Sequence, residues 1–243
     1  MRLFYVLTAM AALALVGSAP LFLRVLSSLP VHTRLPLPAL VALQSLQVMA
    51  LSALAAYAGV RFAPRTRLDA PWLRAFAERS VRPPGFAGMA IHGVALGSLA
   101  AVATAAALLA LRSSVPEPLS RQAPLGFWAG VSSALYGGVV EEIMVRWGLL
   151  SALLALARKL GARDGFWPAN AAAALVFGAA HLPVARAFGA SLTAPVVTYV
   201  LAANAPAGLL FGWLFRRRGL ESAMLAHGAA DVWLHAALPA LLA

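Results

Sequence analysis

Residues 87–111 read AGMAIHGVALGSLAAVATAAALLAL, a stretch without Asp, Glu, Lys or Arg. A helix that crosses a bilayer needs about 20 mainly apolar residues to span the hydrocarbon core. This stretch therefore predicts a transmembrane helix. Six other ranges are similarly apolar, so the sequence predicts an all-α, polytopic transmembrane helical bundle of about seven spans, at 3–23, 37–60, 87–111, 126–157, 168–183, 191–215 and 221–242.

The composition of the whole chain supports this fold class. Of the 243 residues, 62% are hydrophobic and only 11% are charged, and the mean hydropathy is +0.83. A soluble domain has roughly 45–50% apolar and about 25% charged residues. The chain has too little polar surface for a soluble globule, so we interpret residues 1–243 as a single integral membrane domain. It has no cysteine, which excludes disulfides, thiolate metal ligands and cysteine nucleophiles.

The basic residues lie between the apolar ranges and indicate an orientation. With the N-terminus inside, 13 basic residues fall in cytoplasmic segments and 5 in outside segments, and Arg146 lies within a span. This asymmetry follows the positive-inside rule, so we predict a cytoplasmic N-terminus and a C-terminus outside. The net charge of +11 is then explained by topology and by contact with anionic lipid headgroups, without nucleic acid as a partner.

The longest loop, 61–86, contains an amphipathic stretch. From Pro71 to Arg82, the side chains of Trp72, Leu73 and Phe76 fall near one helical face, and charged side chains fall toward the other. This pattern favours a helix that lies in the plane of the lipid headgroups. An ordinary charged loop is the alternative interpretation.

Several ionisable side chains fall within the predicted spans. Each costs roughly 2.5–3.5 kcal/mol to insert, so each is a functional candidate. His92, Asn204 and His235 are also at membrane depth. The remaining candidates form three clusters with helical spacing: Glu141, Glu142 and Arg146 in the fourth span, Phe177 and His181 in the fifth, and His227 and Asp231 in the seventh.

In the first cluster, Glu142 and Arg146 are four residues apart and can pair on one helix face. Glu141 points to another side of the helix and is less able to share the same guanidinium. A carboxylate without a cationic partner in an apolar environment suits a general base that works near neutral pH. The alternative is a structural Glu–Arg clamp between helices.

The other two clusters each have a structural alternative as well. His181 follows Phe177 by four residues, and a histidine at the end of a span is often a capping or interfacial residue. His227 and Asp231 are also four residues apart, so the carboxylate can fix the imidazole tautomer or stabilise its charged form. A buried polar pair that holds helices together explains the same spacing.

Taken together, the patterns EExxxR, FxxxH and HxxxD on separate spans resemble the CPBP family of intramembrane endopeptidases. This is the CAAX-protease and bacteriocin-processing group, also called the ABI family, which includes Rce1-like prenyl-protein proteases. The resemblance covers roughly 126–235. Asp231 is a departure, because the family usually has Asn at that position.

The resemblance implies catalytic roles for four residues. Glu141 is expected to be the general base for a water, and His181 to position or polarise that water. His227 and Asp231 are expected to bind the developing oxyanion, with Glu142, Arg146 and Phe177 as supporting residues. The resemblance further implies a membrane-tethered substrate, such as a lipidated peptide, a C-terminal sorting or anchor peptide or a leader peptide, and a location in the bacterial inner membrane.

Other interpretations remain open at the level of sequence. Two histidines and two or three carboxylates could form a zinc site, but HExxH is absent, and we predict an enzyme without a cofactor. Intramembrane Glu, His and Arg also build proton-coupled transporters, although the chain has no internal repeat. A non-catalytic immunity or scaffold protein is a third interpretation.

Overall fold

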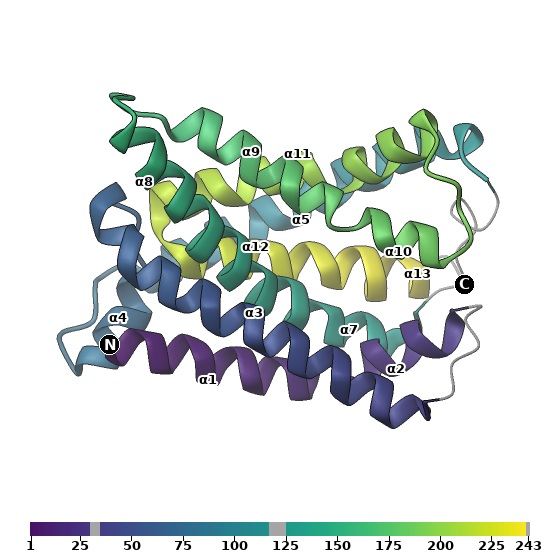
Figure 1. Ribbon diagram of the computed structural model, residues 1–243, viewed down its shortest axis with the longest axis horizontal. Helices are drawn as coiled ribbons and strands as arrows, with labels where there is room; N and C mark the ends of the chain where they lie inside the picture. The colour runs from purple at the N-terminus through teal and green to yellow at the C-terminus, as the bar shows by residue number, and fades with distance from the viewer. Residues whose placement is uncertain (30–34, 117–124, 242–243) are drawn as a thin grey trace.

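The computed structural model describes residues 1–29, 35–116 and 125–241. Within these ranges every regular element is a helix, which confirms the all-α fold. The helices run roughly along the long axis of the molecule, and the two termini lie at opposite ends (Figure 1). Termini at opposite ends agree with an odd number of passes along this axis.

Each of the seven predicted ranges is helical over most of its length. Among the described residues, four helical stretches are long and apolar enough to cross a membrane, namely Leu37–Thr66, Phe86–Ser114, Phe166–Ala187 and Ala194–Arg218. A fifth is obtained if the bent N-terminal pair is one span. The first range is not one straight helix, because α1 (Arg2–Gly17) and α2 (Ala19–Ser28) meet at an angle of 53°.

The other predicted ranges contain either one long helix or several shorter helices. The single long helices are α3 (Leu37–Thr66), α5 (Phe86–Leu111, extended by η1, Arg112–Ser114) and α11 (Ala194–Arg218). The fifth range is split into α9 (Phe166–Ala179) and α10 (Leu182–Ala187). The seventh consists of α12 (Leu220–Asp231), η4 (Val232–Ala237) and α13 (Leu238–Leu241).

The fourth range is helical from 127 to 159, but its middle has π-helical geometry. The π-helical segments η2 (Tyr136–Glu141) and η3 (Ile143–Leu150) lie between α7 (Phe127–Leu135) and α8 (Ser151–Lys159). Gly137 and Gly138 fall within η2, and Gly148 falls within η3. Such turns are rare and occur frequently at functional sites.

The amphipathic stretch of loop 61–86 forms α4 (Pro71–Glu78). The helix ends four residues before the expected end at Arg82, because Arg79 adopts the left-handed backbone conformation with φ of 56°. Its first turn is capped by another element, since the Leu73 amide donates a hydrogen bond of 2.8 Å to Glu221 Oε1 of α12. The helix is confirmed, and its position in the headgroup plane stays a prediction.

Helix α12 lies in the middle of the bundle, with α1 and α3 on one side and α5, α9 and α11 on the other (Figure 1). Glycines allow this close packing. A Cβ atom at Gly97 of α5 would overlap the backbone of Ala226, and one at Gly93 would approach the Ser222 carbonyl at 2.8 Å. Helix α12, which carries His227 and Asp231, is therefore packed closely against α5.

Candidate active site

The three polar clusters converge in the interior of the bundle. Glu141 and Glu142 come from the junction of η2 and η3, His181 from the link between α9 and α10, and His227 from α12. The structure brings all seven candidate residues into this site. It does not bring in His92, whose Nδ1 lies 2.6 Å from the Gly88 carbonyl, or Asn204, which donates to the Val200 carbonyl.

Arg146 is the cation of the site and is almost completely buried. Its Nη1 lies 3.2 Å from Glu142 Oε1, as the four-residue spacing predicted, and the side chains are 2% and 0% exposed. Nη2 donates a hydrogen bond of 3.2 Å to the Gly208 carbonyl of α11. The guanidinium also lies over the rings of Phe177 and Phe211, 4.7 and 5.5 Å from their centroids. Ion pair, hydrogen bond and cation–π contacts together compensate the buried charge.

Glu142 contacts His227 as well as Arg146. Its Oε1 accepts a hydrogen bond of 2.8 Å from His227 Nδ1. The sequence had suggested Asp231 as a carboxylate that can fix the imidazole tautomer, whereas the hydrogen-bonded partner of the ring is Glu142. Phe211 stacks on the imidazole, with ring centroids 4.8 Å apart. The ring is therefore held at one edge and on one face, and its Nε2 is directed away from Glu142.

Glu141 lies between two imidazoles. Its Oε1 is 4.0 Å from His181 Nε2, and its Oε2 is 3.7 Å from His227 Nε2. Both separations exceed a direct hydrogen bond, and polar groups at such distances are commonly bridged by water. The side chain is 13% exposed. As the sequence predicted, Glu141 makes no ion pair with Arg146 among the contacts of the described residues.

His181 has one defined tautomer when it is neutral. Its Nδ1 is 2.9 Å from the Phe177 carbonyl, which can only accept, so Nδ1 carries the proton. The lone pair of Nε2 then faces Glu141. At 33% exposed, His181 is the most accessible of the motif side chains, so the site opens near the link between α9 and α10.

Asp231 faces two histidines. Its Oδ1 lies 3.8 Å from His227 Nε2 and 4.0 Å from His235 Nε2. Space for this carboxylate depends on Gly137, because a Cβ atom there would overlap Asp231 Oδ2 and would lie 2.8 Å from His227 Nε2. The absence of a side chain at Gly137 therefore leaves room for two site residues.

Three neighbours of the site were not predicted from the sequence. Gly208 and Phe211 were not considered, and the contact of His235 with Asp231 was not foreseen. His235 carried a readable signal, since it follows Asp231 by four residues and lies on the same helix. Phe211 and Gly208 of α11 carried none, because their spacing from the motifs reflects only tertiary packing.

Within 1–29, 35–116 and 125–241, no group of three or more His, Asp and Glu side chains is arranged to hold a metal ion. Independence from metal stays a prediction.

The fold and this site define a multi-pass helical membrane protein with a buried cluster of carboxylates and imidazoles. Residues 123–233 match the family described as type II CAAX prenyl endopeptidase, Rce1-like. This match confirms the resemblance drawn from the three motifs and assigns the segment that contains them to the CAAX-protease family. The family assignment implies peptidase activity in general. No curated protein and no solved structure gives a significant match.

Proposed function

We propose that the protein is an intramembrane endopeptidase of the glutamate type, which hydrolyses a peptide bond in a membrane-tethered substrate. The family match supports the peptidase activity. The observation that carries the mechanism is the position of the Glu141 carboxylate between His181 Nε2 and His227 Nε2, at 4.0 and 3.7 Å.

Glu141 and His181 activate the attacking water. With Nδ1 bonded to the Phe177 carbonyl, neutral His181 presents an acceptor at Nε2, and Glu141 presents a second acceptor opposite it. A water between them donates one hydrogen to each, so its lone pairs are free to attack the scissile carbonyl. As the bond forms, Glu141 takes the proton as general base and later delivers it to the leaving amine.

His227 stabilises the oxyanion of the tetrahedral intermediate. Because Nδ1 donates to Glu142, Nε2 can donate to the oxyanion only when both ring nitrogens carry protons. Three carboxylates within 4 Å of the ring, those of Glu141, Glu142 and Asp231, balance the charge of that form. An ionised Asp231 has no proton to donate, so it acts through His227 and not on the oxyanion.

The reaction needs no covalent intermediate and no metal. The chain has no cysteine, and the three motifs contain no serine or threonine that could serve as nucleophile. Glu141 supplies the base, and His227 supplies the electrostatic stabilisation that a zinc ion would otherwise provide.

The substrate is tethered to the membrane, because the site lies among helices that cross it. Lipidated C-terminal peptides, C-terminal sorting or anchor peptides and leader peptides all satisfy this condition. We place the enzyme in the bacterial inner membrane with its N-terminus in the cytoplasm. This orientation is supported by hydrogen bonds that join the segments richest in arginine at one end of the bundle: Arg158 to the Arg65 carbonyl, Arg216 to Asp164 and the Leu220 amide to the Asp69 carbonyl.

The decisive experiment compares wild type with Glu141→Gln in proteoliposomes that contain a lipidated peptide substrate. The amide cannot take the proton, so the cleavage rate should fall about 10²–10⁴-fold while membrane abundance is unchanged. Glu78→Gln is the matched control, because Glu78 is an exposed residue of α4. In ¹⁸O-labelled water, the wild type should place the label in the new carboxyl group. Near-normal turnover by Glu141→Gln would overturn the mechanism.

A further inference from the structure

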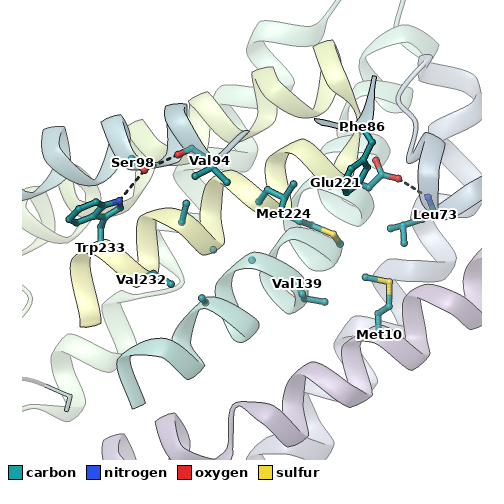
Figure 2. A pocket seen from close by; sticks show the side chains of 15 residues that line it. Met10, Leu73, Phe86, Val94, Ser98, Val139, Glu221, Met224, Val232 and Trp233 are labelled. Carbon is teal, nitrogen blue, oxygen red and sulfur yellow. Dashed lines mark hydrogen bonds between the residues drawn. The ribbon is translucent and has the colours of Figure 1, made fainter. Parts of the chain in front are cut away.

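A groove of about 600 Å³ runs along one face of α12 (Figure 2). Its walls come from α1, α4, α5, α7, η2, α12 and η4, and include Met10, Leu73, Phe86, Val94, Met224 and Trp233. None of the motif residues lines it. The groove is therefore separate from the proposed site of hydrolysis.

The shape of the groove fits a single extended chain. Between Glu221 and Trp233, the continuous helix formed by α12 and the start of η4 rises about 18 Å at about 1.5 Å per residue. A volume of about 600 Å³ over this length gives a mean cross-section of about 33 Å². The length is close to the thickness of one leaflet, about half of the ~30 Å hydrocarbon core.

The chemistry of the walls fits hydrocarbon and not peptide. The polar side chains that line the groove are Ser98 and Glu221. Ser98 Oγ is already engaged, because it accepts from Trp233 Nε1 at 3.0 Å and donates to the Val94 carbonyl at 2.9 Å. An extended peptide would leave its backbone amides and carbonyls unpaired along such walls.

Glu221 gives one end of the groove a specific polar group. The residue is 7% exposed, and its Oε1 accepts the hydrogen bond from the Leu73 amide (Figure 2). Its Oε2 is buried and has no hydrogen-bond partner. An unsatisfied buried acceptor is costly, so a donor from outside the chain is expected at this point. This end lies at headgroup level, because the adjacent Leu220 amide is bonded to the charged 61–86 loop at Asp69.

We propose that the groove binds one acyl chain of phosphatidylethanolamine, whose ammonium group donates a hydrogen bond to Glu221 Oε2. The chain lies along α12 from Glu221 toward Trp233, within the leaflet on the side of α4. A carboxylate favours a cationic donor, and phosphatidylcholine is a poor replacement because its quaternary ammonium has no N–H to donate. The lipid then covers the side of α12 that no other described helix covers.

The test is native mass spectrometry of the full-length protein in detergent, with phosphatidylethanolamine and phosphatidylcholine of identical acyl chains. Wild type should bind phosphatidylethanolamine about tenfold more tightly, which corresponds to about 1.4 kcal/mol. Glu221→Gln should lose this preference but still bind both lipids, and Glu78→Gln should retain it.

A second variant tests the groove without touching its polar end. Val94 is 45% exposed and lines the groove, so Val94→Phe should fill it and reduce binding of both lipids at least about tenfold. Val102→Phe, on the same helix at a 61% exposed position outside the groove, is the matched control and should bind normally. Equal affinity of wild type for the two lipids, or normal binding by Val94→Phe, would overturn the proposal. Displacement of the phospholipid by an equimolar lipidated peptide would also overturn the proposal, because the groove would then be a binding site for the substrate.

Discussion

Replacing Arg146 with methionine isolates the contribution of the buried cation. The side chain of Glu142 is 0% exposed, so the substitution leaves a carboxylate in the bundle interior without its cation. Breaking a buried pair in this way costs about 3–5 kcal/mol. Because His227 still donates to Glu142, we expect a value near the lower limit, about 3 kcal/mol.

For a chain of this length, a loss of about 3 kcal/mol lowers Tm by about 6–12 °C. Thermal unfolding of the purified protein in detergent measures this shift. The control is Arg217→Met, because Arg217 is exposed at the end of α11. We expect the control to stay within about 2 °C of wild type, since exposed charges contribute little to stability.

The double variant Arg146→Met/Glu142→Gln separates charge from packing. It removes both members of the pair but keeps an amide oxygen that can accept from His227. We expect it to recover more than half of the loss in Tm, because no isolated charge remains buried. If Arg146→Met alone unfolds within about 2 °C of wild type, or if the double variant is no more stable than the single one, the account of the pair is wrong.

Three further predictions concern activity. Gly137→Ala should reduce the cleavage rate about a hundredfold, because the new Cβ displaces Asp231 and His227. Gly88→Ala is the control and should cleave normally, because no atom lies within 4 Å of the added carbon. Equal cleavage rates for the two variants would refute the role of Gly137. Asp231→Asn should lower the rate up to about 10²-fold, because His227 loses a carboxylate that balances its charged form. Full activity of Asp231→Asn, with a pH–rate profile extended to higher pH, would instead indicate that Asp231 acts as a protonated donor. Dialysis against a chelator should leave the cleavage rate unchanged; loss of activity together with bound zinc, and its return when zinc is added, would contradict a metal-free mechanism.

Sequence patterns predicted those features that depend on local periodicity. Long apolar runs located the helices, because a bilayer imposes a minimum length on each span. A spacing of four residues predicted the contact of Glu142 with Arg146 and the proximity of His227 and Asp231, since such residues share a helix face. The amphipathic pattern predicted α4, although not its end at Glu78.

Features that depend on contacts between distant segments could not be read from the sequence. The hydrogen bond between Glu142 and His227 joins residues 85 positions apart, so no local spacing encodes it. Phe211 is one of many apolar residues in α11, and only the packing of that helix against α12 brings its ring onto the imidazole. The bend at Ser18 is different, because Pro20 in the first turn of α2 cannot continue the hydrogen bonding of α1 and is a local signal of a break.

The glycine contacts between α5 and α12 determine which parts of the site can move. Gly93 and Gly97 bring the two backbones so close that α12 cannot rotate or slide without carrying α5 along. His227 therefore lies on a rigid pair of helices, α5 and α12. The link that contains His181 is different, since the helix is interrupted there and the side chain is one-third exposed. We therefore expect the admission of substrate and the release of products to be controlled from the α9–α10 side, while the α12 side remains fixed throughout turnover.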